Sequence, residues 1–283
     1  MRRVREISAG TVTETLRDLF IAANLEMGRD MQDALARAAE EEESPLGRYV
    51  LQKILENMDV ARKESLPLCQ DTGLAVVFAE MGQEVHIVGG DFQAAVQEGV
   101  RQAYREGYLR KSLCDPLSRR NTGDNTPAVI FTEVVPGDRL KLIAMPKGGG
   151  SENMSCSAML VPAEGKAGIV DHVVACVRKA GSNPCPPVLV GVGIGGSLEM
   201  SGVLAKKALL RPLGTANAHD ERLAAMEREI LEGVNRLGIG PQGYGGRVTA
   251  LAVHMEMMPC HIASLPVTVN IQCHVARHRE AVL

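Results

Sequence analysis

Cysteine is the residue type in this chain that could take part in the widest range of chemistry. It occurs at seven positions: Cys69, Cys114, Cys156, Cys176, Cys185, Cys260 and Cys273. Thiolates act as nucleophiles and as ligands for soft metals and iron–sulfur clusters. The sequence contains no CxxC pair, so a metal site would take its ligands from distant segments. The odd count, together with the lack of an apolar stretch after the basic residues 1–10, argues against a secreted disulfide framework. Most of these thiols are therefore expected to be small buried residues.

Three of the cysteines lie in segments that carry other reactive or rigid residues. Cys69 begins CQDTG at 69–73, where Asp71 could act as a general acid or base and a glycine permits unusual backbone angles. Cys185 lies between prolines in NPCPP, which stiffen the backbone around the thiol. Cys273 precedes a histidine at the end of an apolar segment. Taken alone, each segment is better explained as an ordinary turn around a buried thiol.

Two glycine-rich segments could approach a ligand closely. KGGGS at 147–151 could line an anion with backbone amides, but it lacks the Gly-Lys-Ser/Thr ending of a P-loop. GVGIGG at 191–196 fits the letters of a dinucleotide-binding motif. The next acid beyond the following helix, Asp220, opens another helix instead of ending a strand, which argues against that motif. A nucleotide-binding or regulatory module that uses Gly191–Gly196 remains the alternative from another functional class.

The periodicity of apolar residues places these segments on a framework of alternating helices and strands. Helical spacing predicts helices over residues 11–62, 92–108, 166–179, 197–210 and 220–236. Apolar runs predict strands over residues 74–79, 85–89, 128–134, 139–145, 186–192, 247–255 and 265–273. The strands at 128–134 and 139–145 are predicted to pair as a hairpin, and the polar stretch 110–127 to form a long loop. The expected fold class is mixed α/β (α+β): a helical N-terminal region at 1–65, then mixed β-sheets flanked by helices at 66–283, in a single domain.

The composition excludes several classes of function. The chain is 45% hydrophobic and 23% charged, as in an ordinary globular protein. Its formal net charge of -3 provides no basic field for nucleic acid. No apolar run approaches the roughly 20 residues that span a bilayer, so no membrane association is expected. The default location is the cytosol.

Taken together, these segments resemble class I iron–sulfur fumarate hydratases in their α subunit or N-terminal region, and the related L-tartrate dehydratase α subunits. The resemblance runs from about residue 45 to the C-terminus. It is carried in order by CQDTG at 69–73, LRKS at 109–112, NTGDNTP at 121–127, KGGGSEN at 147–153, NPCPPVLVGVGIGG at 183–196, KALLRPLGT at 207–215, NRLGIGPQGYGG at 235–246 and VNIQC at 269–273. Any single segment is weak support, but eight in order are strong.

The resemblance implies a 4Fe–4S cluster held by three thiolates, which correspond to Cys69, Cys185 and Cys273. Three ligands leave one iron open to act as a Lewis acid. Asp71 and His261 correspond to the catalytic pair that moves a proton at the substrate carbon. Arg110 corresponds to a substrate-binding arginine, and Gln70 and Gly149 are implied to add substrate hydrogen bonds. Residues 66–283 are thus expected to form the cluster- and substrate-binding part, and the other four cysteines to be structural.

The implied activity is that of a hydro-lyase of the tricarboxylic acid cycle that reversibly hydrates fumarate to L-malate. The alternative is an L-tartrate dehydratase α subunit. The loop GGGSEN is closer to fumarases than the GGGCTLPG typical of tartrate dehydratases, so fumarate is favoured. Single-chain relatives continue into a second catalytic part, whereas this sequence ends ten residues after Cys273. A separate β subunit and an α2β2 heterotetramer are therefore expected.

Overall fold

The computed structural model describes residues 4–283, and residues 1–3, which begin the predicted helical region, lie outside the described residues. The chain divides into two compact units. Unit 1 comprises Met1–Gly28, Met58–Gly149 and Arg277–Leu283, and unit 2 comprises Arg29–Asn57 and Gly150–Ala276. The expected fold class is confirmed, because long N-terminal helices precede two mixed sheets that carry helices. The expected single domain stays a prediction.

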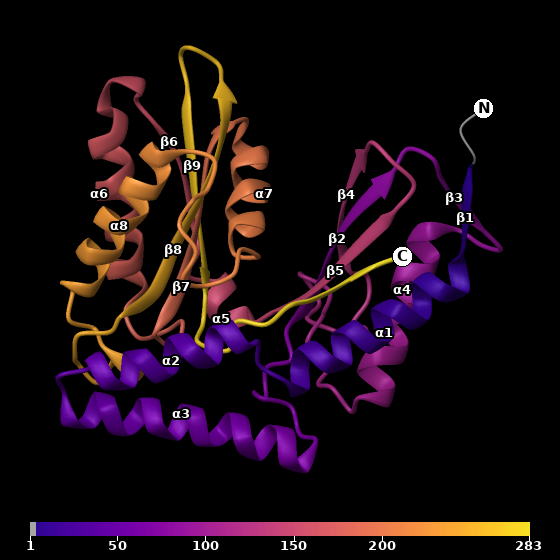
Figure 1. Ribbon diagram of the computed structural model, residues 1–283, viewed down its shortest axis with the longest axis horizontal. Coiled ribbons are helices and arrows are strands. Elements are labelled where there is room, and N and C mark those ends of the chain that lie inside the picture. Colours follow the sequence, from indigo (N-terminus) through magenta and orange to yellow (C-terminus); the bar gives the residue numbers. More distant parts are fainter. Residues whose placement is uncertain (1–3) are drawn as a thin grey trace. The chain divides into compact units, whose positions relative to one another are not determined.

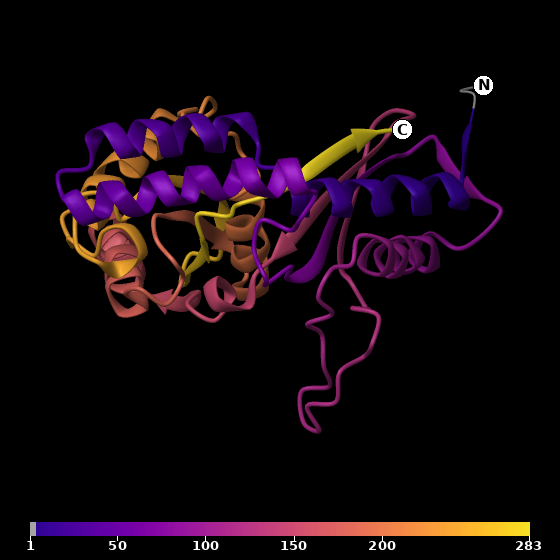
Figure 2. The ribbon, with the colours of Figure 1, turned by 90° about the horizontal axis from the view of Figure 1, so that it is seen from below.

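Unit 1 is built on a four-stranded mixed sheet with the order β10-β5-β2-β4. Its strands are β2 (Leu74–Gly82), β4 (Val129–Val135), β5 (Leu140–Lys147) and β10 (Arg279–Val282), and a second, two-stranded parallel sheet joins β1 (Arg5–Ser8) to β3 (Val85–Val88). Helices α1 (Ala9–Leu25) and α4 (Phe92–Glu106) run side by side (Figure 2). They bury Leu16, Phe20 and Tyr104 in one core with the alternate residues of β2 and β5. Burial of these apolar side chains is the main stabilising term of the unit.

The predicted hairpin of residues 128–134 and 139–145 is wrong. Both strands form, but β2 lies between them, parallel to β4 and antiparallel to β5. The amide of Gly82 donates to the carbonyl of Arg139 (2.8 Å) and the amide of Gln83 to that of Val135 (2.8 Å), so the end of β2 occupies the turn. The continuous apolar run of β2 explains the result, because a strand that is buried on both faces belongs at the centre of a sheet.

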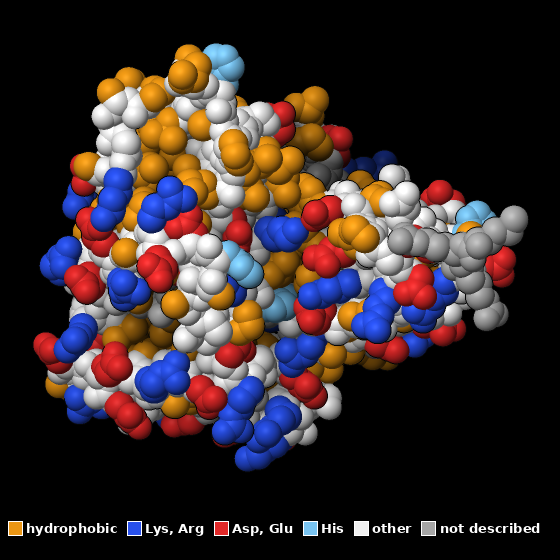
Figure 3. All heavy atoms as spheres, turned by 45° about the horizontal axis from the view of Figure 1, so that its top comes forward, with side chains coloured by type: hydrophobic (Ala, Val, Ile, Leu, Met, Phe, Trp, Pro, Cys, Tyr) orange, Lys and Arg blue, Asp and Glu red, His pale blue; other side chains and the backbone are white. Residues whose placement is uncertain are grey.

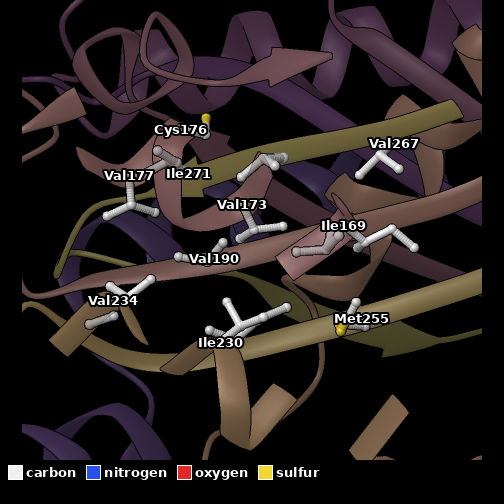
Figure 4. Close-up of a cluster of buried hydrophobic side chains, with 14 of the residues drawn as sticks. Ile169, Val173, Cys176, Val177, Val190, Ile230, Val234, Met255, Val267 and Ile271 are labelled. Atoms are coloured by element: carbon white, nitrogen blue, oxygen red, sulfur yellow. The ribbon is translucent and has the colours of Figure 1, made fainter. Parts of the chain in front are cut away.

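Unit 2 is a second four-stranded mixed sheet with the order β6-β9-β7-β8. Its strands are β6 (Cys156–Leu160), β7 (Val188–Gly196), β8 (Ala250–Cys260) and β9 (Leu265–Gln272). Helices α6 (Gly165–Ala180) and α8 (Glu221–Asn235) cover one face and α7 (Leu198–Ala208) the other (Figure 1). Shorter elements are α5 (Gly149–Glu152), η1 (Pro162–Glu164) and η2 (Pro241–Gly243). Val173, Ile230 and Ile271 belong to the core between α6, α8 and the sheet (Figure 4).

Helix α2 (Arg29–Glu41) and the first part of α3 (Pro45–Glu64) also belong to unit 2. The connection between them contains Glu42, which belongs to the acidic run at 40–43; such a run is typical of a solvated surface, yet the side chain of Glu42 is fully buried. Its two oxygens accept hydrogen bonds from the amides of Ser44 (2.9 Å), Arg247 (2.9 Å) and Val248 (2.8 Å). Burial opposes ionisation of Glu42, but these amides outweigh it and hold the pKa of the carboxyl below its usual value. Glu42 thus links the connection between α2 and α3 to the segment before β8 through hydrogen bonds.

The glycines at 191–196 have a packing role. Gly191 and Gly193 lie on β7, where a Cβ atom would collide with the backbone of α7 at Ala205 and at Ser201. Only glycine lets the helix approach the strand so closely. Packing thus accounts for part of the pattern that resembles a dinucleotide motif. Within residues 4–283, no helix combines the length and apolar character needed to cross a membrane.

We expect Gly193→Ala to destabilise unit 2 by about 1–3 kcal/mol, because the added methyl group must push α7 away from β7. Gly202→Ala is the matched control, since Gly202 lies in α7 with open space around its Cβ position. That change should stabilise the helix by about 0.5–1 kcal/mol. Urea unfolding of both variants measures the difference. Equal stabilities would show that the helix and strand are not in close contact.

Candidate functional site

Four of the residues implied to bind substrate or move protons line one cavity of unit 1, with a volume of about 430 Å³. These are Gln70, Asp71, Arg110 and Gly149. The remaining lining residues are Leu74, Ser112, Leu113 and Lys147. The sequence places these residues on three separate segments, and the fold brings the segments together at the N-terminal end of β2 and the C-terminal end of β5.

The carboxylate of Asp71 is fixed by backbone amides on both of its oxygens. Oδ1 accepts the amide of Gly73 at 3.0 Å, and Oδ2 accepts the amide of Gly149 at 2.8 Å. Gly73 has a φ of 76° and lies against the backbone of Lys147, so a side chain at this position would clash. Because a charged acceptor strengthens such bonds, the carboxylate is held in one orientation without a side-chain partner. Asp71 is therefore positioned for proton transfer to or from a molecule in the cavity.

Asn125 joins the Asp71 turn to the segment that carries Arg110. Its side chain is fully buried, and its Oδ1 accepts the amides of Ser112 (2.8 Å) and Leu113 (3.1 Å). Its Nδ2 donates to the carbonyl of Gly73 at 3.2 Å. The sequence shows Asn125 only as one of several turn formers in NTGDNTP, so its role was missed. Its φ of 63° suits asparagine, which tolerates the left-handed region.

Two further buried side chains hold the same turn from the core. The hydroxyl of Tyr104 donates toward the carbonyls of Thr72 (2.7 Å) and Gly73 (2.9 Å), and burial raises the pKa of this phenol. The guanidinium of Arg277 donates to the carbonyl of Asp71 at 2.5 Å. Arg277 begins the basic stretch RHR at 277–279, which in sequence is typical of a solvated terminus, but the structure shows it 4% exposed. No local pattern distinguishes this arginine from its neighbours.

The three cysteines implied to bind the cluster occupy turns in different units. Cys69 belongs to unit 1, beside the cavity, and its Sγ accepts the amide of Asp71 at 3.4 Å. Cys185 and Cys273 belong to unit 2. Cys185 precedes β7 and Cys273 follows β9, and because these strands are antiparallel neighbours, both cysteines lie at the same end of the sheet.

The loop around Cys185 is held by two residues outside it. The ring Nδ1 of His274 donates to the carbonyl of Cys185 at 2.9 Å. The backbone amide and side-chain Nε2 of Gln242 donate to the carbonyl of Pro186 at 2.7 and 2.9 Å. Cys185 itself has a φ of 55°, which is uncommon for a residue other than glycine and persists only when the surroundings enforce it. Gln242 is a second residue whose role the sequence did not indicate.

His261 lies at the exposed tip between β8 and β9 in unit 2. Its Nδ1 accepts the amide of Ala263 at 3.1 Å, which leaves Nε2 to carry the proton in the neutral ring. Exposed apolar side chains gather around this tip and the start of α7 (Figure 3). They are Leu198, Met200, Met257, Met258 and Ile262. Asp71 belongs to unit 1, so the pairing of Asp71 with His261 stays a prediction.

The glycine loop that contributes Gly149 is anchored at its C-terminal end by a charge pair. Lys206 Nζ donates to Oε1 of Glu152 at 2.7 Å, and Nδ2 of Asn270 donates to Oε2 at 3.2 Å. Lys206 is 9% exposed, so the pair is shielded from solvent more than a surface salt bridge. The loop is thus fixed on one side by Asp71 and on the other by Glu152.

The donor set fits an iron–sulfur cluster. None of the seven cysteines forms a disulfide. Thiolate sulfur is the usual ligand of iron–sulfur clusters, and the three proposed ligands are all cysteines. Within the part of the chain that is described, no three His, Cys, Asp or Glu side chains surround a single metal ion. The thiolates of a 4Fe–4S cluster each bind a different iron, so its ligands need not surround a single ion.

Comparison with known proteins gives one family. Residues 13–282 match the profile described as fumarate hydratase (Fumerase). A Methanocaldococcus jannaschii protein, provisionally named an L(+)-tartrate dehydratase subunit alpha, is 40% identical over 274 residues, which cover 94% of this chain and 95% of the relative. Proteins named L(+)-tartrate dehydratase subunit alpha from Escherichia coli K12 and Shigella boydii are each 32% identical, over 99% of this chain and 92% of the relative.

We expect Asn125→Gly to lower the free energy of unfolding by about 1–3 kcal/mol, because the amides of Ser112 and Leu113 lose their partner and the carbonyl of Gly73 keeps only Tyr104. Glycine keeps the positive φ, so the comparison with Asn125→Ala, expected to cost about 1 kcal/mol more, isolates the backbone contribution. Hydrogen exchange should accelerate at the amides of Ser112 and Leu113. Unchanged exchange at these two amides would contradict the assigned role.

Proposed function

Because the chain belongs to the fumarate hydratase (Fumerase) family, we propose that it is the α subunit of a hydro-lyase that adds water to, or removes it from, a four-carbon dicarboxylate. The observation that carries the proposal is the cavity of unit 1, which combines an oriented carboxylate, Asp71, with an exposed guanidinium, Arg110. An acid–base group beside a carboxylate-binding cation is what elimination of water from a hydroxy acid requires. The proposed hydro-lyase activity rests on this combination and on the family.

A 4Fe–4S cluster would be held by Cys69, Cys185 and Cys273. When bound, it would supply a Lewis acid that polarises the hydroxyl of the substrate. Substrate binding and proton transfer are assigned to residues of this chain. Arg110 would bind a substrate carboxylate through paired hydrogen bonds, and Gln70 would donate a further one.

Proton transfer is assigned to Asp71 together with His261. Asp71 would accept or return the proton of the carbon beside the hydroxyl-bearing carbon through its carboxylate. The amides of Gly73 and Gly149 keep this carboxylate from rotating, so the entropic cost of alignment is met before substrate binds. In this arrangement the amide of Gly149 is engaged with Asp71. We therefore assign Gly149 a positioning role toward Asp71 in addition to its implied substrate contact.

Two substrates are candidates. The names of the relatives support L-tartrate more directly than fumarate. The loop GGGSEN at 148–153 and the name of the family support fumarate and L-malate. L-tartrate and L-malate differ by one hydroxyl group. Discrimination between them therefore depends on a few contacts in the pocket. Sequence identities of 32–40% leave room for such a difference.

The relatives named subunit alpha also support a β subunit for this chain, and α2β2 is the assembly we propose. The apolar tip that carries His261 is the kind of surface that a partner covers. A cytosolic location is part of the same proposal, as the lack of a membrane-spanning helix in residues 4–283 is compatible with it.

The cluster assignment is tested by replacing the ligands one at a time. After anaerobic treatment with iron and sulfide, the chain should bind both in the ratio of a 4Fe–4S cluster. Cys69→Ser, Cys185→Ser and Cys273→Ser should each lose most of the visible absorbance and iron content, because serine is a poor ligand for iron–sulfur clusters. Cys114→Ser should retain both. Stoichiometric zinc without sulfide would indicate a structural metal scaffold instead.

The activity is tested with the chain and its β subunit, using L-tartrate, L-malate and fumarate. The relatives' names favour a higher kcat/KM for L-tartrate, and a higher value for L-malate and fumarate would favour the fumarase assignment. With either substrate, Asp71→Asn should lower kcat by about 10²–10⁴-fold, as expected for loss of a proton-transfer group. Asp115→Asn, which changes a turn aspartate outside the cavity, is the control. Full activity of Asp71→Asn would contradict the mechanism.

A further inference from the structure

Cys156, His172 and Cys176 form a sulfur–imidazole cluster in unit 2, away from the proposed ligands in sequence. Cys156 lies on β6, the edge strand of the sheet, and the other two lie one turn apart on α6. The Sγ of Cys156 is 3.6 Å from Nε2 of His172, and the Sγ of Cys176 is 3.6 Å from the carbonyl oxygen of Met154. Cys156 packs against the buried cluster to which Cys176 belongs. Figure 4 shows Cys176 among the side chains of the apolar core.

The surroundings of Cys156 favour its thiolate. The hydrogen bond from Cys176 and then the imidazole of His172 lower the pKa of Cys156, against the opposing effect of burial, and Lys179 adds a favourable charge. The bond to Cys156 in turn raises the pKa of His172, and Glu164 acts in the same direction. The pKa of Cys176 is raised by its bond to Cys156 and by burial. One sulfur is therefore activated and the other is kept as a thiol.

We propose that Cys156 and Cys176 form a peroxide-reactive thiol pair, with Cys156 as the attacking sulfur and Cys176 as the resolving sulfur. In the first step, the thiolate of Cys156 attacks one oxygen of a hydroperoxide and breaks the O–O bond. Cys156 becomes a sulfenic acid, and the other oxygen leaves as water or an alcohol after taking a proton from His172. In the second step, the thiol of Cys176 attacks the Cys156 sulfur, a disulfide forms, and the sulfenic oxygen leaves as water. Two thiols thus lose two electrons, which reduce the hydroperoxide.

The burial of the two sulfurs fits this order of events. Cys156 is half-buried on an edge strand, where a small oxidant can reach it, whereas Cys176 is 7% exposed and faces the core. A buried thiol is a poor first target for an oxidant, but it can react with a neighbouring sulfur that has already been oxidised. Sequence reasoning assigns both cysteines a structural role, because no spacing rule links a strand residue to one 20 positions later on a helix.

The test uses the full chain, prepared anaerobically and treated with one equivalent of hydrogen peroxide. Alkylation and peptide mass spectrometry should show a Cys156–Cys176 disulfide while Cys114 and Cys260 remain alkylated. In Cys176→Ala, the sulfenic acid of Cys156 should persist and be trapped by dimedone. Oxidation of Cys156 no faster than that of Cys114, or no bond to Cys176, would overturn the proposal.

The role of His172 has a separate readout. The alkylation rate of Cys156 should stay high at pH values below those at which an ordinary thiol loses its reactivity, because its thiolate persists there. His172→Gln should shift the midpoint of this pH profile upward and slow alkylation near pH 6.5 by about tenfold, the equivalent of one pKa unit. An unchanged pH profile in His172→Gln would show that His172 does not stabilise the Cys156 thiolate, and would overturn this part of the proposal. Stoichiometric zinc that is lost in Cys156→Ser would also contradict a redox role. None of these readouts needs an active hydro-lyase or a bound cluster.

Discussion

The structure of unit 1 depends on satisfying the buried polar backbone of one turn, Cys69–Gly73. A turn that enters the central strand of a sheet carries amides and carbonyls into a region that water does not reach, and each must find a partner. The carboxylate of Asp71 accepts one hydrogen bond from an amide of the turn, that of Gly73, and one from the glycine loop, the amide of Gly149. Its own carbonyl and those of the next two residues receive donors from Arg277, Tyr104 and Asn125. The carboxylate that we propose to transfer the proton is thus oriented by the same bonds that make the turn stable.

This constraint explains why the informative segments of the sequence are far apart. NTGDNTP supplies Asn125, which holds the turn, and KGGGSEN supplies Gly149, which holds the carboxylate. NRLGIGPQGYGG supplies Gln242, which holds the loop around Cys185 in unit 2. Each segment contains a residue that holds one of the turns on which the proposed catalytic or ligand residues lie. Substituting such a residue would therefore alter activity without touching a substrate, through the position of the group it holds.

The sequence predicts the long elements well and the pairing of strands less well. Helical periodicity places the N-terminal helical stretch and α4, α6, α7 and α8 within a few residues, because each is long enough to show an apolar stripe at helical spacing. It misses β1, β6 and β10, which have four or five residues each and too few apolar positions to form a pattern. It predicts the wrong neighbour for β4 and β5, because local turn signals cannot show that a strand from earlier in the chain will lie between them. Asn125, Arg277 and Glu42 are missed because polar residues buried by long-range contacts look like surface residues in a sequence.

The charges of the cavity bear on what the chain can do alone. A four-carbon dicarboxylate carries two negative charges at neutral pH. The residues that line the cavity within unit 1 include two basic side chains, Arg110 and Lys147, and one acidic side chain, Asp71. Lys147 is fully buried, so Arg110 is the cation with access to solvent among these lining residues. One guanidinium can hold one carboxylate through two parallel bonds. The second carboxylate then needs a cation from outside these lining residues, and the proposed β subunit is one source of it.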